Sequence, residues 1–222
     1  MRDLFIVGAG GLGREAAWTV ERINAASQQP LWRLIGFADD DPAKATGNFE
    51  GYPMLGSVEK ASKDHPGASV FIAIGDNAIR RKVYAQLRGH DFPAMIDPSA
   101  QVSPTTEFKH GTFIAVEAVV SVGTDIGKFV IINSRAGIGH DSVVGDFANV
   151  APGVSLSGHT TLGADVFMGT NSCTAPGLTV GEGARVERTI LNENASIAAG
   201  ASIGAPGKIT VIGDRAVMEV DV

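Results

Sequence analysis

Large apolar residues recur at every sixth position through the second half of the chain. The series runs from Ile96 to Val186, and only Thr174 interrupts it. Mostly small or β-branched residues follow the large ones by four positions, as Ala100 follows Ile96. A period of six matches neither a helix, which repeats every 3.6 residues, nor a single strand, which repeats every two. The pattern predicts a parallel β-helix in which each six-residue unit forms one short strand and one corner.

Each unit of this repeat assigns a place to its side chains. We expect the large residue to fill the interior and the small residue to point inward near the corner. With three units in a triangular coil, the span from Ile96 to Val186 predicts five coils of 18 residues. Glycine often follows the large residue directly, and we expect it to supply backbone freedom at the bend. After Val186 the series shifts by one residue and continues as Leu191, Ile197, Ile203 and Ile209.

The first half of the chain alternates strand and helix patterns instead. Short buried strands are predicted at the apolar runs 4–7, 34–38 and 70–74. Amphipathic helices are predicted at about 14–26 and about 78–88, the second with an apolar face formed by Ile79, Val83 and Leu87. Strands that alternate with helices indicate a small Rossmann-like α/β domain. The predicted domains are therefore an α/β domain over residues 1–95 and a β-helix over residues 96–222.

A glycine-rich turn joins the first predicted strand to the first predicted helix. Residues 8–13 fit the pattern GxGxxG completely, in the strand–turn–helix context that cradles phosphate groups. Such glycines let the backbone approach a diphosphate, whose charge the helix N-terminus favours. Asp39 and Asp40 follow the second strand, where an acidic residue can hydrogen-bond a ribose or a base edge. The candidate substrate-binding residues here are Gly8, Gly10, Gly11, Leu12, Asp39 and Asp40.

Composition restricts the functions that remain possible. The chain is 44% hydrophobic with 28 glycines, which suits a Gly-rich β-solenoid. The single cysteine, Cys173, excludes an internal disulfide and a CxxC metal site and fits a reducing cytoplasm. No signal-like segment precedes Leu4, and no apolar run approaches the ~20 residues of a membrane span. We therefore expect a cytoplasmic protein without a membrane partner.

Charge argues against nucleic acid as a ligand. Residues 1–95 carry 11 basic and 11 acidic side chains, whereas residues 96–222 carry 7 basic and 13 acidic ones. A nucleic-acid-binding protein should show a basic stripe instead. A small-molecule substrate is the better expectation.

His140 is the candidate catalytic residue of the repeat. It occupies the third position of its unit, where side chains point outward, and Asp141 follows it directly. A neutral histidine near pH 7 can remove a proton from an amine or hydroxyl nucleophile, a gain of about 10²–10⁴ in rate. A neighbouring carboxylate fixes the tautomer and stabilises the imidazolium. This chemistry requires no metal and no covalent enzyme intermediate. His159 lies 18 residues after Asp141, one coil further on, and could approach the same site.

The order of the two domains and several short stretches resemble one family of bacterial enzymes. The stretches are 8–13, 37–40, 73–80, 138–147 and 171–173. In these the chain is similar to the hexapeptide-repeat sugar acetyltransferases that include sialic acid O-acetyltransferases and UDP-4-amino-sugar N-acetyltransferases of glycan synthesis. The resemblance implies a left-handed β-helix that forms a homotrimer. It also implies acetyl-CoA in the groove between two subunits and a nucleotide sugar on the N-terminal domain.

The resemblance also implies roles for individual residues. His140 corresponds to the family's catalytic base, and Asp141 to the carboxylate that orients it and raises its basicity. Residues at positions that contact acetyl-CoA are Asn149, Gly158, which presents a backbone amide, and Thr170. The C-terminal part of the chain departs from the family, and the nearby cations there that could meet the CoA phosphates are Arg185, Arg188 and Lys208. Further nucleotide-sugar contacts are expected at Gly75, Asp76 and Asn77.

The predicted function is transfer of an acetyl group from acetyl-CoA to an amino or hydroxyl group of a nucleotide-linked sugar. Two alternatives remain at this stage. The full GxGxxG pattern, with Leu12 where the family often has histidine, also fits an NAD(P)-binding protein. A β-helix can also serve as a trimeric binding module without any catalytic chemistry.

Overall fold

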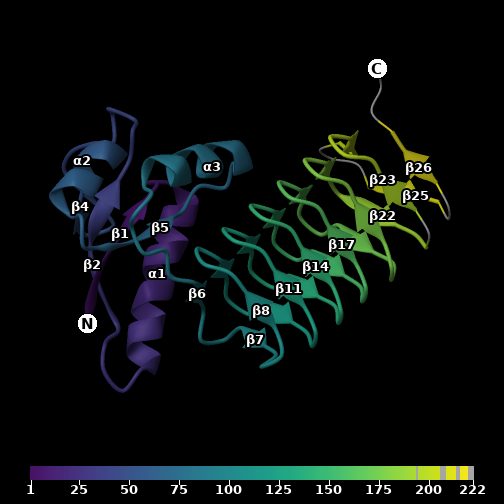
Figure 1. Ribbon diagram of the computed structural model, residues 1–222, viewed down its shortest axis with the longest axis horizontal. Helices are drawn as coiled ribbons and strands as arrows, with labels where there is room; N and C mark the ends of the chain where they lie inside the picture. Colours follow the sequence, from purple (N-terminus) through teal and green to yellow (C-terminus); the bar gives the residue numbers. More distant parts are fainter. Residues whose placement is uncertain (194, 206–208, 214–215, 220–222) are drawn as a thin grey trace. The chain divides into compact units, whose positions relative to one another are not determined.

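The structure, a computed structural model, describes residues 1–193, 195–205, 209–213 and 216–219. The chain divides into two compact units, Met1–Pro98 and Ser99–Val222. In Figure 1 the first unit is drawn in purple to blue-green and the second in teal to yellow. Among the described residues, no helix combines the length and the apolar character needed to cross a bilayer.

The N-terminal unit is a three-stranded parallel sheet with three helices. The strands are β1 (Arg2–Val7), β2 (Trp32–Ala38) and β5 (Ser69–Ile72), in the order β2-β1-β5. The helices are α1 (Gly11–Ala26), α2 (Val58–Asp64) and α3 (Asn77–Gln86), and a small hairpin consists of β3 (Asn48–Phe49) and β4 (Tyr52–Pro53). The three predicted strands and two predicted helices are confirmed. The sequence patterns missed α2 and the hairpin because both elements are too short to show periodicity.

The predicted apolar face of α3 is partly wrong. Ile79 is 51% exposed, whereas Arg80 is buried beside Val83. The Arg80 guanidinium donates hydrogen bonds to the carbonyl oxygens of Ile74 at 2.7 Å and Gly75 at 3.2 Å. Because these carbonyls satisfy the charged group, burial of Arg80 is possible, and the helix turns Ile79 outward.

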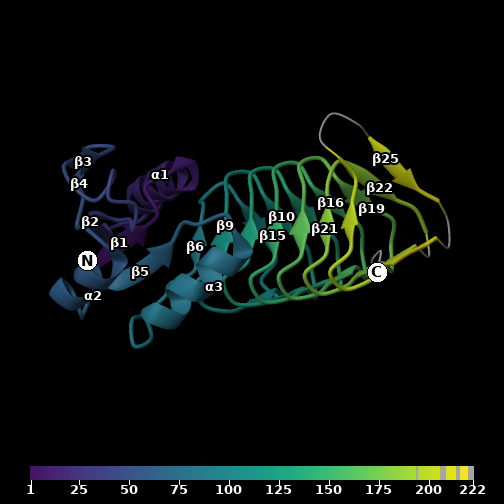
Figure 2. The same ribbon diagram turned by 90° about the horizontal axis from the view of Figure 1, so that it is seen from above.

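The second unit is a left-handed parallel β-helix with three flat faces, which Figures 1 and 2 show from two sides. The first face contains β7 (Gln101–Val102), β10 (Val119–Val120), β13 (Gly137–Ile138), β16 (Ser155–Leu156), β19 (Cys173–Thr174), β22 (Thr189–Leu191) and β25 (Thr210–Ile212). The second contains β8 (Glu107–Phe108), β11 (Asp125–Ile126), β14 (Val143–Val144), β17 (Thr161–Leu162), β20 (Thr179–Val180), β23 (Ser196–Ile197) and β26 (Val217–Met218). The third contains β9 (Phe113–Ile114), β12 (Ile131–Ile132), β15 (Asn149–Val150), β18 (Phe167–Met168), β21 (Arg185–Val186) and β24 (Ser202–Ile203). The strand β6 (Met95–Ile96) precedes these coils in the chain.

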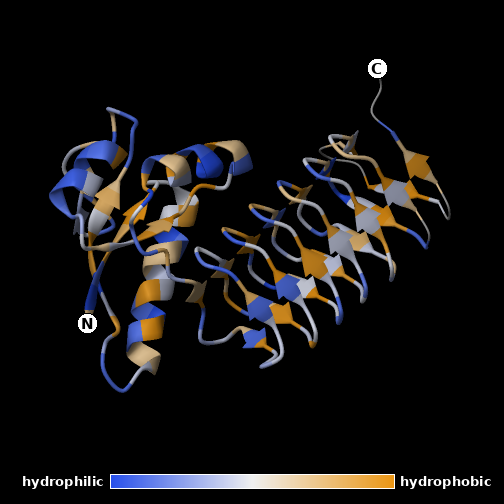
Figure 3. Cartoon of the chain, viewed as in Figure 1, coloured by the Kyte–Doolittle hydropathy of each residue, from blue (hydrophilic) through white to orange (hydrophobic). Residues whose placement is uncertain are grey.

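The six-residue pattern correctly predicts most of the interior. Fully buried residues at the predicted large positions include Ile114, Val120, Ile126, Ile132, Val144, Val150 and Met168. In Figure 3 hydrophobic segments, drawn in orange, recur from coil to coil along the stack. Phe108 is an exception and is exposed, since β8 is the first strand of its face.

The predicted interior position of Ile209 is also wrong. Ile209 is 70% exposed, and Ile212 is buried instead. Ile190 pairs with Val211, a longer spacing than that between Cys173 and Ile190 in the preceding coil. The chain inserts extra residues before β25, so the period of six does not continue to the end of the repeat.

The glycines that follow the large residues have a different role from the one predicted. For the glycines from Gly127 to Gly181 the left-handed backbone conformation occurs two positions later, for example at Phe129 and Asp141, with φ of 54° and 56°; Gly204, which follows Ile203, itself has φ of 84°. A Cβ on Gly145 would instead lie 2.5 Å from the backbone nitrogen of Ala164 in the next coil. These glycines are therefore needed because stacked coils approach closely at the end of each strand, not because the backbone bends there.

Replacement of Gly145 by alanine should consequently destabilise the β-helix. We expect the free energy of unfolding to fall by about 1–3 kcal/mol, the usual cost of an added group in a fully packed interior. The matched control is Gly137→Ala, because a Cβ at Gly137 meets no atom within 4 Å. Chemical denaturation of both variants measures the difference. Equal midpoints would show that the coils can separate at no cost.

Candidate active site

His140 and Asp141 lie at the corner where the first face of the β-helix turns into the second. His140 follows the buried Ile138 by two positions, and its side chain is exposed. Asp141 adopts φ of 56°, and its N–H donates to the carbonyl of Val122 at 2.9 Å in the preceding coil. A Cβ on Gly123 would lie 2.6 Å from Asp141 Oδ1. The glycine of the preceding coil therefore leaves space for the carboxylate.

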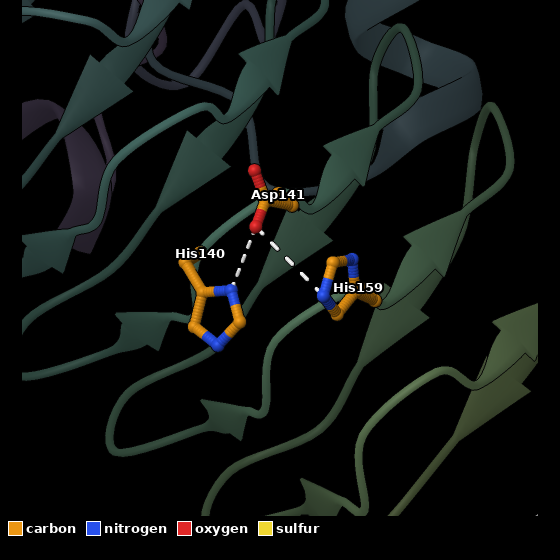
Figure 4. A group of neighbouring side chains, drawn as sticks. All are labelled: His140, Asp141 and His159. Carbon is orange, nitrogen blue, oxygen red and sulfur yellow. Dashed lines mark hydrogen bonds and ion pairs between the residues drawn. The ribbon is translucent and has the colours of Figure 1, made fainter.

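The two side chains form a hydrogen-bonded pair. His140 Nδ1 lies 2.8 Å from Asp141 Oδ2 (Figure 4). An ionised carboxylate can only accept, so the hydrogen is assigned to Nδ1 and the lone pair to Nε2. The same hydrogen bond lowers the pKa of Asp141 below its usual value, and the nearby charge of His159 acts in the same direction. In the neutral imidazole, this pairing leaves Nε2 able to accept a proton.

Gly158 of the next coil supports the imidazole ring. A Cβ on Gly158 would lie 2.5 Å from His140 Nε2 and 2.6 Å from Cε1, so the ring rests directly on the glycine. Among the residues that the structure describes, the Gly158 N–H has no recorded acceptor. The position thus combines room for the ring with an available backbone donor.

His159 lies closer to this pair than its sequence position alone could establish. Its Nε2 is 3.8 Å from Asp141 Oδ2, and its ring is edge-on to that of His140, with centroids 5.0 Å apart. The His159 N–H donates to the carbonyl of His140 at 2.8 Å, which ties the two coils together. The signal in the sequence is the spacing of 18 residues from Asp141, which is one full coil.

Two of the three proposed acetyl-CoA contacts lie away from His140 on the β-helix. Asn149 is part of β15 on the third face, where it pairs with Ile131 and Phe167. Thr170 is exposed at the corner between the third and first faces. Gly158 is the only one of the three proposed contacts that the described residues of a single chain bring against His140.

The candidate cations for the CoA phosphates have different surroundings. Arg185 forms an ion pair with Glu187, and its guanidinium lies 4.1 Å from the ring centroid of Phe167. Arg188 is exposed. Lys208 lies outside the described residues.

The glycine-rich turn of the N-terminal unit contains two kinds of glycine. Gly8 has φ of 107°, and a Cβ there would lie 2.7 Å from the Ala73 carbonyl oxygen, while one on Gly13 would overlap the carbonyl of Gly8. These two glycines are required by the packing of the fold. A Cβ on Gly10 or Gly11 would meet no atom within 4 Å. The open space lies at the N-terminus of α1, where Gly10 provides no side-chain cap; the half-buried Leu12 follows.

The two acidic residues that follow β2 hold backbone in place. Asp39 Oδ2 accepts a hydrogen bond from the Ala9 N–H at 2.8 Å, and so ties β2 to the glycine-rich turn. Asp40 Oδ1 accepts from the Val58 N–H at 2.9 Å in the first turn of α2.

Polar residues after β5 have similar local roles. Asp76 caps α3, since its Oδ1 accepts from the Ile79 N–H at 2.8 Å. Asn77 Oδ1 accepts from Arg80 at 3.1 Å, and the Gly75 carbonyl accepts from the same guanidinium. The structure thus places these candidates at the strand ends and gives each at least one structural hydrogen bond.

Removal of the Asp39 carboxylate should destabilise the N-terminal unit. Asp39→Ala leaves the buried Ala9 N–H without this acceptor, and we expect a loss of about 1–3 kcal/mol in the free energy of unfolding. Glu15→Ala, at an exposed position on α1, is the control. Thermal denaturation measures both. An unchanged transition in the Asp39 variant would mean that another group satisfies the amide.

The chain is similar in sequence and in fold to several known proteins. Residues 3–87 match the family model of the PglD N-terminal domain. GDP-perosamine N-acetyltransferase of Escherichia coli O157:H7 is 26% identical over 175 residues, which cover 78% of each chain. The acetyltransferase domain of PglB from Neisseria gonorrhoeae FA1090, solved in complex with acetyl coenzyme A, superposes with a TM-score of 0.78 at 26% identity, over 92% of this chain and 96% of that one. WeeI from Acinetobacter baumannii AYE superposes with a TM-score of 0.80 at 25% identity, over 94% of this chain and 100% of that one.

The similarity extends over both units of the chain. The family match covers the α/β unit, and the structural matches cover the α/β unit together with the β-helix. The chain is therefore homologous to sugar acetyltransferases over both units, and residues 3–87 form an N-terminal unit of the PglD N-terminal domain type.

Proposed function

We propose that this chain transfers an acetyl group from acetyl-CoA to an amino group of a nucleotide-linked sugar, with His140 as the general base. A sugar hydroxyl is the close variant, because the same base serves both acceptors. The observation that carries the proposal is the His140–Asp141 pair, in which a carboxylate holds Nδ1 and leaves Nε2 able to accept a proton.

The reaction follows from the geometry of this pair. The acceptor nitrogen attacks the thioester carbonyl carbon as His140 Nε2 takes its proton, and the carbonyl oxygen becomes negatively charged. We assign stabilisation of that oxygen to the N–H of Gly158, the glycine on which the His140 ring rests. Asp141 stabilises the imidazolium that forms. The C–S bond then breaks, and the proton passes from His140 to the departing sulfur of CoA.

The comparisons support both substrates. The PglB domain was solved with acetyl coenzyme A, and the relative from Escherichia coli is a GDP-perosamine N-acetyltransferase, an enzyme named for a nucleotide-linked amino sugar. We therefore propose acetyl-CoA as the co-substrate and a nucleotide-linked amino sugar as the acceptor. We place the reaction in the cytoplasm and in glycan biosynthesis as parts of the same proposal.

The α/β unit is the proposed site for the nucleotide. Its sheet order places β1 between β2 and β5, so the chain reverses direction across the sheet beside the glycine-rich turn. Ligands of parallel α/β sheets bind at such a point, outside the carboxyl ends of the strands. The open space beside Gly10 and Gly11 at the N-terminus of α1 suits a diphosphate. Asp39, Asp40 and residues 75–77 would border it.

A homotrimer would complete the acetyl-CoA site. Among the described residues, the first face is the one without charged residues at its outward strand positions, which are Gln101, Val119, Gly137, Ser155, Cys173, Ile190 and Val211. Such a face suits burial against another subunit. A groove between subunits would bring Asn149 and Thr170 of one chain toward His140 of another. Light scattering tests this: a monomer would leave the groove unformed.

Product analysis tests the reaction itself. The full chain is incubated with acetyl-CoA and GDP- or UDP-linked amino sugars, and products are analysed by mass spectrometry. We expect a gain of one acetyl group on the amino sugars; a gain on the corresponding sugars that carry a hydroxyl in place of the amine would favour the hydroxyl variant. Thermal shifts with acetyl-CoA, the sugars and NAD run in parallel, since a ligand of the native state raises stability. A shift with NAD alone, without acetylated product, would overturn the proposal.

A further inference from the structure

Three potential metal ligands meet at the corner that holds the proposed base. His140, Asp141 and His159 each offer one ligand atom, and these atoms all lie within 4.8 Å of one another. Figure 4 shows both rings directed toward the same oxygen of Asp141. We propose that these three residues bind a divalent d-block cation of the Zn²⁺ class, and that the bound metal and the base function of His140 exclude each other.

The separations between the ligand atoms fit such an ion. Zn²⁺ binds imidazole nitrogen and carboxylate oxygen at about 2.0–2.2 Å, so neighbouring ligand atoms of a tetrahedral site are about 3.4 Å apart. Asp141 Oδ2 lies 2.8 Å from His140 Nδ1 and 3.8 Å from His159 Nε2, one below and one above that value. Movements of about half an ångström within the side chains would equalise these two separations.

The backbone holds the ligands in a rigid frame. Asp141 and His159 occupy equivalent corner positions one coil apart, with nearly identical φ of 56° and 57°. The hydrogen bond from the His159 N–H to the His140 carbonyl at 2.8 Å fixes the coils to each other. Because the scaffold is already ordered, metal binding would require little further ordering of the chain.

The ligand set selects the type of metal. Two imidazoles and one carboxylate suit Zn²⁺, Co²⁺ or Ni²⁺, whereas Mg²⁺ and Ca²⁺ prefer oxygen ligands throughout. The side chains of His140, Asp141 and His159 are 54%, 52% and 63% exposed. An ion held by three residues at this exposed corner keeps a fourth position open to water.

Metal binding would change the state of His140. A neutral imidazole has one lone pair, which is on Nε2 while Nδ1 donates to Asp141. A metal on Nδ1 replaces that hydrogen bond and moves the hydrogen to Nε2, which can then no longer accept a proton. Inhibition by metal therefore rests on the proposed function, but metal binding itself does not.

Cobalt binding tests the site independently of activity. The full chain is freed of metal with a chelator and titrated with Co²⁺ while the visible absorption is recorded; Zn²⁺ then competes in calorimetry. We expect one ion per chain and no response to Mg²⁺ or Ca²⁺. His159→Asn should weaken binding more than tenfold, since loss of a supporting partner alone costs about 10–100-fold. Asparagine tolerates the left-handed φ of residue 159, so the fold should be retained.

A matched histidine variant controls for unspecific binding. His110 occupies the same place in its repeat unit as His140, two positions after a strand residue, but Gly111 follows it. His110→Asn should therefore bind Co²⁺ as the unmodified chain does. No absorption change in the unmodified chain, or equal affinity in His159→Asn, would overturn the proposal.

Inhibition is the second readout. Acetyl transfer is measured with and without Zn²⁺, and each variant is compared with its own metal-free rate. We expect inhibition that EDTA reverses, at metal concentrations more than tenfold higher in His159→Asn, in step with the weaker binding. Metal binding without acetyl transfer in any condition would remove the proposed function and leave the metal site. Acetyl transfer without metal binding would remove the metal site alone.

Discussion

Replacement of His140 by alanine is expected to lower kcat for acetyl transfer by about 10²–10⁴-fold, the usual contribution of a general base. The exposed imidazole fills no part of the β-helix interior, so the variant should keep its melting temperature. Binding of acetyl-CoA, measured by calorimetry, should also remain, because the thioester needs no proton acceptor to bind. The loss should therefore appear in kcat.

A second histidine provides the control for this variant. His110→Ala removes a histidine from the same place in its six-residue unit, but at the corner between the second and third faces, and should leave kcat unchanged. Full activity of His140→Ala would remove His140 from the mechanism. Loss of folding in that variant would contradict the position of the ring outside the β-helix.

Replacement of Gly158 by alanine is the second large effect that we expect. The added methyl group would lie 2.5 Å from His140 Nε2, so the ring must turn away from its present position. Displacement of a catalytic group by about 1 Å can reduce the rate about 10²-fold, and we expect a loss of that order in kcat. The free energy of unfolding should change little, because the atoms nearest the new methyl group all belong to one exposed side chain that can move.

Alanine variants of two other glycines serve as controls that distinguish the loss of kcat in Gly158→Ala from general destabilisation of the β-helix. At Gly145 the clash is with backbone, so Gly145→Ala should lose stability, whereas Gly137→Ala, whose added Cβ meets no atom of the same chain within 4 Å, should keep it. Steady-state kinetics together with denaturation measure all three variants. A fully active Gly158→Ala enzyme would show that the ring works from another position.

Several features follow from the sequence because they depend on local or strictly periodic interactions. The period of six predicts the coils, since each strand can bury only the side chains that point inward. The strand–turn–helix order around residues 8–13 predicts the parallel α/β unit. The outward position of His140 follows from its place two residues after a buried isoleucine.

Other features depend on groups that are distant in the sequence. Arg80 replaces Ile79 on the buried side of α3 because backbone carbonyls beside β5 satisfy its charge. The hydrogen bond from Ala9 to Asp39 links the ends of two strands. Neither interaction leaves a periodic signal in the sequence. The sequence therefore predicts where the strands end, but not which polar groups at those ends already form hydrogen bonds within the fold.

The sequence by itself therefore determined the two-unit architecture, the interior of most coils and the outward position of His140. Only the tertiary structure decided how neighbouring coils meet: that Gly145 is needed for close approach of backbone, that Gly158 supports the His140 ring, and that His159 reaches the same carboxylate. The physical reason is that a repeat specifies which way each side chain points. The distances between side chains on successive coils, which decide the chemistry of the corner, arise only when the coils stack.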